Sequence, residues 1–203
     1  MHRVILLHGI ETSTGASEPR NWPARLEGIW ETKQDLSFRV SSWIWSGIYF
    51  NWVWGVLTWL PWYRKAVNKS VLENLAEIER FVANSAVSQG QLSVIAHSYG
   101  GTLVQTALEQ GWHFHKIILL ATTMDENFDW RKYEKQFNSV LVCWSPDDNV
   151  TVHSTYGMQG KKGPLVPHER VTNMKLDGMK HFDWITPQGL TSFGEAYRHF
   201  LES

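Results

Sequence analysis

Several features that mark whole classes of protein are missing from this sequence of 203 residues. It has one cysteine, Cys143, so no disulfide can form within the chain. Its first ten residues lack the long apolar core and the small-residue cleavage site of a secretory signal peptide. No long block of like charges, internal repeat or low-complexity tail is present. These absences favour a reducing compartment, and we expect a cytoplasmic location.

Charge and motif content exclude further classes. The 19 basic residues nearly balance the 20 acidic ones, and a formal net charge of −1 gives no electrostatic footprint for nucleic acid. No His-Glu-x-x-His motif or cysteine cluster suggests a metal site, and no G-x-G-x-x-G follows an apolar run. We therefore expect neither a nucleic-acid partner nor a metal or other cofactor. Cys143 lies within an apolar run and is expected to be a buried small hydrophobe.

Tryptophan is unusually abundant, and most of the twelve tryptophans lie between Trp22 and Trp62. Residues 44–60 contain no charged side chain and approach the short limit of a membrane span, about 17–25 residues. They also contain glycine, serine, threonine and asparagine, and a span here would interrupt a domain with strands on both sides. We interpret the segment as an aromatic cap over a pocket, or as a surface that dips into a membrane interface. Extra core packing is the alternative.

Short apolar runs alternate with helical patterns along the chain. The runs predict strands at residues 3–7, 36–43, 91–96, 116–121, 139–144 and 170–176. Periodicity near 3.6 predicts helices at residues 22–30, 66–86, 102–111, 127–136 and 187–201. This alternation is typical of an α/β fold, with a mostly parallel sheet of about six strands between two layers of helices. We expect residues 1–203 to form a single domain and the glycine-rich, basic residues 157–167 to form a flexible loop.

The most informative stretch is residues 92–101, L-S-V-I-A-H-S-Y-G-G. An apolar run stops at Ala96, and a glycine pair three residues later opens a helical pattern. Ser98 then stands at the apex of a sharp strand-to-helix turn. This is the arrangement of the nucleophile elbow, G-x-S-x-G, with alanine in place of the first glycine. The alternative is an ordinary strand-to-helix turn whose serine caps the helix.

Other reactive side chains also follow predicted strands. Asp147 and Asp148 come after the fifth strand, and His181 comes after the sixth. Ligands of open parallel sheets bind beyond the carboxyl ends of the strands, where these side chains would gather with Ser98. A serine hydroxyl is a weak nucleophile and needs a histidine base, which in turn needs a carboxylate to fix its tautomer. The order serine, aspartate, histidine is also that of hydrolases with this kind of sheet.

Together these motifs resemble the α/β-hydrolases. The residues that carry the resemblance are H-G-I at 8–10, A-H-S-Y-G-G at 96–101, S-P-D-D-N-V at 145–150 and G-M-K-H-F at 178–182. The resemblance covers nearly the whole chain, although the two leading antiparallel strands of the family are absent. It therefore implies a compact, three-layered α/β-hydrolase domain.

The resemblance also implies roles for individual residues. Ser98 would be the nucleophile and His181 the base. Asp148 best matches the acid, because the family tends to have a valine two residues later, and Asp147 is the alternative. The oxyanion hole would consist of the backbone N–H groups of Tyr99 and Ile10. Of the other histidines, His8 would shape the first loop, His97 would pack or hydrogen-bond beside the nucleophile, and His153 is a weaker candidate for substrate contact.

The function so implied is a serine hydrolase that cleaves a carboxylic ester or thioester through an acyl-enzyme. The connection at 122–138, where the family usually carries its lid, is short. We therefore expect the tryptophan-rich segment at about 44–62 to serve as lid and acyl-binding wall, and its pocket candidates are Trp45, Trp52, Trp54 and Trp59. The same segment could make a peripheral membrane contact. The alternatives are an acyltransferase, or a non-catalytic lipid- or protein-binding module on a hydrolase scaffold.

Overall fold

The computed structural model describes residues 2–7, 22–31, 38–43, 69, 72–73, 75–80, 92–151, 154 and 156–203. Its strands are β1 (His2–Leu7), β2 (Phe38–Trp43), β3 (Leu92–His97), β4 (Phe114–Leu120), β5 (Phe137–Trp144) and β6 (Val171–Lys175). Its α-helices are α1 (Trp22–Glu31), α4 (Gly100–Glu109), α5 (Gln159–Lys162) and α6 (Pro187–Glu202). Short 3-10 helices span Trp130–Gln136 and Asp183–Ile185.

The six strands form one sheet in the order β2-β1-β3-β4-β5-β6, and every neighbouring pair is parallel. The register brings the ends of the strands together: Leu7 pairs with Ala96, His97 with Leu120, and Leu120 with Cys143. The loops that follow these strands therefore begin at one edge of the sheet. The prediction of a parallel α/β sheet of about six strands is confirmed.

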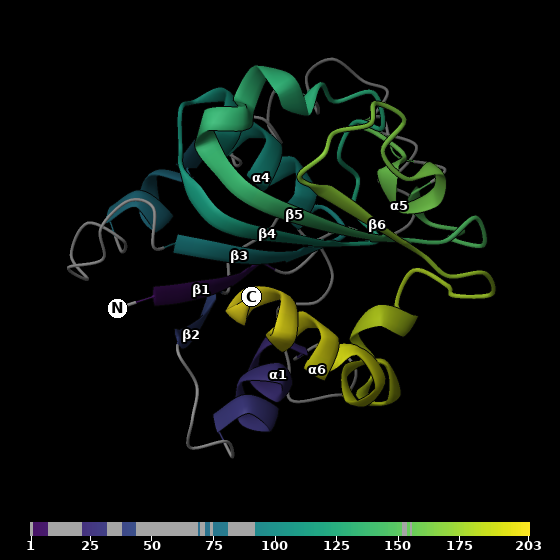
Figure 1. Ribbon diagram of the computed structural model, residues 1–203. Helices are drawn as coiled ribbons and strands as arrows, with labels where there is room; N and C mark the ends of the chain where they lie inside the picture. Colours follow the sequence, from purple (N-terminus) through teal and green to yellow (C-terminus); the bar gives the residue numbers. More distant parts are fainter. Residues whose placement is uncertain are drawn as a thin grey trace.

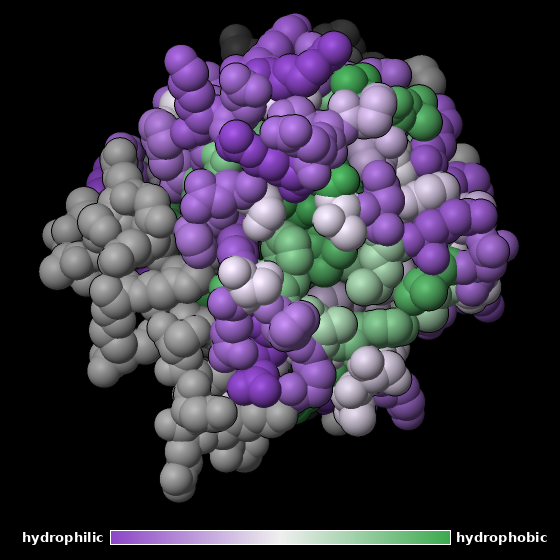
Figure 2. Space-filling view, in the orientation of Figure 1, coloured by the Kyte–Doolittle hydropathy of each residue, from purple (hydrophilic) through white to green (hydrophobic). Residues whose placement is uncertain are grey.

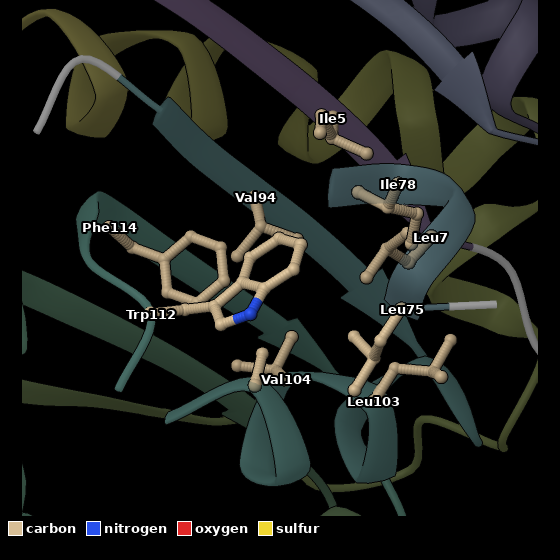
Figure 3. Close-up of a pocket in the computed structure, with 10 residues that line it drawn as sticks. Ile5, Leu7, Leu75, Ile78, Val94, Leu103, Val104, Trp112 and Phe114 are labelled. Atoms are coloured by element: carbon tan, nitrogen blue, oxygen red, sulfur yellow. The ribbon is translucent and has the colours of Figure 1, made fainter. Parts of the chain in front are cut away.

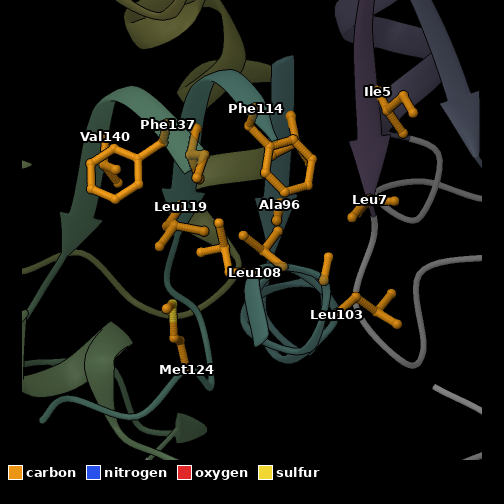
Figure 4. Close-up of a cluster of buried hydrophobic side chains, with 14 of the residues drawn as sticks. Ile5, Leu7, Ala96, Leu103, Leu108, Phe114, Leu119, Met124, Phe137 and Val140 are labelled. Carbon is orange, nitrogen blue, oxygen red and sulfur yellow. The ribbon is translucent and has the colours of Figure 1, made fainter. Parts of the chain in front are cut away.

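Helices cover both faces of the sheet, with α4 above it and α1 and α6 below it in Figure 1. Side chains of the central strands point alternately to the two faces, as the pleat requires. Ile117 and Leu119 of β4 join the cluster under α4, whereas Ile118 and Leu120 join the cluster against α1 and α6. Figure 4 shows the first cluster, in which β3, β4 and β5 meet α4. Because the central strands are buried on both sides, their sequences are almost continuously apolar.

The second cluster is less completely covered near the edge of the sheet. β6 is one of the two edge strands, and its residues are half-buried or exposed. Apolar side chains reach the surface between β6 and α6, near the middle of Figure 2. The partly buried residues that pack against the cluster from these two elements are Met174, Phe193 and Phe200.

Helix termini agree with the sequence signals. Gly111, with a φ of 89°, follows α4 and accepts the left-handed conformation that a helix C-terminus requires. Thr186 caps α6 by accepting a hydrogen bond from the Gly189 N–H, and Pro187 occupies the first turn. Within the predicted helix at 66–86, the described residues 69, 72–73 and 75–80 are helical, and Leu75 and Ile78 are buried as their spacing predicts.

One prediction was wrong. Residues 157–167 do not form a flexible loop, because α5 lies within them and Gln159 and Gly160 are buried. The tryptophan-rich segment 44–62 lies outside the described residues. No helix in the described part of the chain is long and apolar enough to cross a membrane.

Candidate active site

Ser98 lies at a strained turn between β3 and α4. Its φ is 54°, a left-handed conformation that costs a residue with a side chain roughly 1–2 kcal/mol. Three backbone hydrogen bonds hold it there: its N–H donates to Leu120, and its carbonyl oxygen accepts from Gly101 and Thr123. The turn lifts the Ser98 hydroxyl off the sheet and places it beside the N-terminus of α4. Positive partial charge at a helix N-terminus favours a negative group at this position.

Small residues let the helix approach the sheet this closely. A Cβ atom on Gly100 would lie 2.8 Å from the carbonyl oxygen of Leu7 and 3.3 Å from the Cβ of Ala96. A Cβ atom on Gly101 would lie 2.4 Å from the Cβ of Thr122. The distances of 2.8 and 2.4 Å are shorter than real Cβ atoms show, so the glycine pair is required by packing. Ala96 also fits, which explains why alanine can replace the first glycine of the motif.

Ser98, His181 and Asp148 form a continuous hydrogen-bonded chain. Nε2 of His181 lies 2.9 Å from Oγ of Ser98, and Nδ1 of His181 lies 2.9 Å from Oδ2 of Asp148. An ionised carboxylate only accepts hydrogen bonds, so Nδ1 of His181 donates. Nε2 of the neutral imidazole is then the acceptor for the Ser98 hydroxyl proton. The structure therefore brings these three sequence-predicted residues together in an arrangement that can remove a proton from Ser98.

Asp148 is fully buried and is fixed at both carboxylate oxygens. Its Oδ1 accepts hydrogen bonds from the backbone N–H groups of Val150 and Thr151, at 2.8 and 3.0 Å. Burial by itself raises the pKa of this carboxyl, but the hydrogen bond and charge of His181 and these two amides outweigh it and leave the pKa lowered. Asp148 therefore stays ionised and can stabilise a positive charge on His181.

Asp147 occupies a different place, although it is the next residue in the chain. It is exposed, and its Oδ2 accepts a 2.6 Å hydrogen bond from the backbone N–H of Gly178. This bond joins residues 145–151, which we call the Asp loop, to residues 176–182, which we call the His loop. The described contacts of Asp147 thus connect the two loops, whereas those of Asp148 include the imidazole itself.

Rings pack against His181 from two directions. The ring centroids of His97 and Phe182 lie 4.8 and 4.9 Å from that of His181. Nε2 of His97 donates a 3.0 Å hydrogen bond to the backbone carbonyl oxygen of His181, since a carbonyl can only accept. The expectation that His97 packs or hydrogen-bonds beside Ser98 agrees with this placement.

Sequence reasoning missed the contribution of α5. Gly160 lies against Asp148, and Nζ of Lys161 donates to the Asp148 carbonyl oxygen at 3.3 Å. The only sequence signal was a glycine in a basic stretch, which did not indicate a partner twelve residues away.

Other predicted site residues are less fully placed. Tyr99 is buried and forms the N-terminal boundary of α4, where backbone N–H groups are not used by the helix's own hydrogen bonds. Ile10, His153 and the four pocket tryptophans, Trp45, Trp52, Trp54 and Trp59, lie outside the described residues. Among the residues that are described, no group of three His, Cys, Asp or Glu side chains could hold a metal ion.

A small apolar cavity lies inside the core between α4 and the helical residues 75–80. Figure 3 shows its lining, which includes Leu7, Val94 and the ring of Trp112. Its volume is about 10 Å³. A single water needs roughly 10–15 Å³ by the same measure, so this cavity is a packing gap and cannot accept a substrate.

Comparison with known proteins identifies the fold. No family model and no curated protein sequence matches the chain. Solved structures do match over its whole length. The ydeN gene product of B. subtilis has a TM-score of 0.64 at 13% identity and covers 100% of both chains. A monoacylglycerol lipase from Paleococcus ferrophilus has a TM-score of 0.60 at 12% identity, over 98% of this chain and 93% of its own.

An esterase from Thermogutta terrifontis, solved with butyrate bound, has a TM-score of 0.56 at 10% identity, over 99% of this chain and 82% of its own. Sequence identity this low shows shared architecture and not shared activity. The shared architecture is a parallel sheet flanked by helices. This chain has the α/β-hydrolase fold.

Proposed function

We propose that the protein is a serine hydrolase that cleaves a carboxylic ester or thioester through a covalent acyl-enzyme. The observation that carries this proposal is the chain of two 2.9 Å hydrogen bonds from Ser98 through His181 to Asp148. A serine in a strained turn, bonded to a histidine whose other nitrogen faces a buried carboxylate, has the geometry of an activated nucleophile.

In the acylation step, Nε2 of His181 takes the hydroxyl proton of Ser98 while Oγ attacks the carbonyl carbon of the ester. The carbonyl π bond opens, and its electron pair becomes the oxyanion of a tetrahedral intermediate. Asp148 stabilises the imidazolium that His181 has become. When the intermediate collapses, the bond to the leaving oxygen or sulfur breaks, and His181 returns the proton to that atom. The alcohol or thiol departs, and the acyl group stays on Ser98.

Deacylation repeats these roles with water. His181 removes a proton from water as the hydroxide attacks the acyl carbon, and it then protonates Oγ of Ser98 as the carboxylic acid leaves. The oxyanion of both steps would be held by the N–H of Tyr99, together with the N–H of Ile10 from the first loop. One such donor is worth about 2.7–4 kcal/mol of transition-state stabilisation. Ser98 lies between the N-terminus of α4 and His181, so the negative charge of the oxyanion develops beside the positive end of the helix dipole.

The structural matches support an ester substrate. Among them are the lipase and the esterase named above, and both names refer to hydrolysis of carboxylic esters. The tryptophan-rich segment 44–62 supports an apolar acyl group, because each aromatic side chain can bury a large apolar area.

The proposal is tested by labelling with a fluorophosphonate, which reacts only with an activated serine. The native protein should be labelled, and both Ser98→Ala and His181→Ala should lose the label while keeping the native circular dichroism spectrum. Failure of the folded native protein to react, in detergent as well as in buffer, would contradict the proposal and favour a non-catalytic binding role.

The acyl preference is tested separately, with p-nitrophenyl esters of increasing chain length. Trp52→Ala and Trp54→Ala should weaken hydrolysis of long-chain esters far more than hydrolysis of the acetyl ester. An equal loss for both substrates would show that these tryptophans do not form an acyl-binding wall.

A further inference from the structure

The segment between β5 and β6 covers the ends of two strands. Residues 156–165, which we call the α5 segment, are bonded through their backbone to the loops that follow β4 and β5. The N–H of Gly160 donates to Thr122, at 2.8 Å, and its carbonyl oxygen accepts from Ser145, at 3.0 Å. The N–H of Gln159 donates to Met124 at 3.2 Å. Gly160 thus connects the loop that follows β4 with the beginning of the Asp loop.

Gly160 is in contact with the carboxylate of Asp148. A Cβ atom at this position would lie 2.9 Å from Oδ2 of Asp148, the oxygen that accepts from His181. It would also lie 2.6 Å from the carbonyl carbon of Ala121, which itself has a strained φ of 46°. Only a residue without a side chain lets the segment lie here. The backbone of Gly160 therefore forms one wall of the site that holds the Asp148 carboxylate.

An ion pair also holds the same segment against Glu126. Nζ of Lys162 lies 2.7 Å from Oε1 of Glu126, and Oε2 of Glu126 accepts from the Met158 N–H at 2.8 Å. The Glu126 carbonyl oxygen also accepts from the Leu165 N–H at 2.7 Å. Glu126 is thus bonded to both ends of the α5 segment, and its side chain is only 9% exposed. Because the Glu126 side chain is nearly buried, loss of the Lys162 ammonium would leave a largely desolvated carboxylate without its ion-pair partner.

We propose that Gly160 and the Glu126–Lys162 ion pair are positioning residues that hold the α5 segment against Asp148 and so fix the carboxylate relative to His181. The inference rests on the proposed function, since the placement of the carboxylate matters for catalysis only if Asp148 supports the base. Neither Gly160 nor Lys162 touches Ser98 or His181 in the described contacts. Their effect is transmitted through Oδ2 of Asp148 and through the Asp loop.

Two variants and two matched controls test this role. Gly160→Ala introduces the clashing Cβ. Lys162→Gln removes the positive charge of the ion pair, at a side chain that is 43% exposed. Gly28→Ala is the control for the first, because a Cβ there meets nothing within 4 Å. Lys69→Gln is the control for the second, because Lys69 pairs with Glu73 on an exposed surface.

The first readout is independent of activity. A proton shared between a histidine Nδ1 and a carboxylate gives a proton NMR resonance far downfield of the amide region. This signal should be present in the native protein and both controls, and absent or moved upfield in Gly160→Ala and Lys162→Gln. The second readout is steady-state hydrolysis of a p-nitrophenyl ester. Displacement by about 1 Å can cost about 100-fold in rate, so kcat of Gly160→Ala should fall towards that extent while KM changes little.

The outcomes separate the two proposals. If Gly160→Ala does not fold, Lys162→Gln decides, with a smaller loss of kcat at unchanged KM expected. A native-like signal and native kcat in a folded variant would overturn the inference. If the native protein shows the downfield signal but hydrolyses no ester and resists fluorophosphonate, the proposed function fails, and the NMR comparison alone decides whether the α5 segment positions Asp148.

Discussion

The turn that carries Ser98 and the loop that carries Asp148 hold their side chains by opposite means. Ser98 is positioned mainly by its own turn, through a left-handed φ of 54° and the small residues Gly100 and Gly101, and backbone hydrogen bonds to Leu120 and Thr123 hold that turn against β4. Asp148 is held partly by its own loop, through Val150 and Thr151, and partly by Gly160. The first arrangement depends on a motif of six residues, whereas the second requires a segment that returns to the site later in the chain. An arrangement set by a short motif can be recognised in a sequence, whereas one set by contacts between distant segments cannot.

The largest effect should come from breaking the Asp148 side of this comparison. Asp148→Asn replaces the acceptor at Oδ2 and lets His181 take the wrong tautomer, and the equivalent change in a serine protease lowers kcat about 10⁴-fold. Asp147→Asn is the matched control: it makes the same change at the neighbouring residue and should change kcat only slightly. Both are measured by ester hydrolysis. A greater loss of kcat in Asp147→Asn than in Asp148→Asn would show that Asp147, and not Asp148, is the acid.

The turn itself is broken by a single methyl group. Gly100→Ala places a Cβ 2.8 Å from a backbone oxygen of Leu7, and overpacking of this kind costs about 1–3 kcal/mol of unfolding free energy. Gly28→Ala, in the open middle of α1, should instead gain up to about 1 kcal/mol from helix propensity. Urea unfolding of the two variants measures the difference. Equal stability of the two variants would show that the close approach at Gly100 is not required.

Acid should affect the two regions differently, because the Asp loop carries carboxylates and the Ser98 turn carries none. The pKa of Asp148 is lowered in the folded protein from its ordinary value of 3.8. Its ionisation therefore stabilises the fold above that value, and this contribution is lost as the pH falls below 3.8 through the lowered pKa. The unfolding free energy of Asp148→Asn should fall less steeply than that of the native protein in this range, whereas Ser98→Ala should follow the native slope. A native slope in Asp148→Asn would contradict the lowered pKa.

The smallest effect is expected where the Asp loop meets the His loop. Asp147→Ala removes the 2.6 Å hydrogen bond to the Gly178 N–H, and a single bond of this kind contributes about 0.5–1.5 kcal/mol. The bond is exposed, so water can replace the lost acceptor. Thermal unfolding measures the change, and a loss well above this range would mean that Asp147 holds more than its described contact.

Much of the fold could be predicted from the sequence because its strands are buried on both faces. A run such as Ile117–Leu120 has no polar partner to satisfy and no solvent face, so a central parallel strand is its natural conformation. Ser98 could be located for a related reason, since close packing restricts positions 96, 100 and 101 to the small residues Ala96, Gly100 and Gly101.

The rest depended on contacts between distant residues. Neighbouring aspartates are almost equivalent in a sequence, and what distinguishes Asp147 from Asp148 is which backbone N–H groups and which imidazole each one meets. Residues 157–167 were expected to be flexible because glycine and lysine favour exposed loops. Backbone hydrogen bonds to Thr122 and Ser145 override that preference, and no local pattern encodes them.

The hydrogen bond between Ser98 and His181 joins residues 83 positions apart, across three crossover connections of the sheet. Contacts of such long range form late in folding, because the entropy of closing the intervening chain must be lost before they can stabilise anything. During synthesis, the Ser98 turn can form on the ribosome well before the histidine that bonds to it has emerged. Refolding followed by circular dichroism should therefore run ahead of refolding followed by fluorophosphonate reactivity, and the lag between them would time the completion of the sheet.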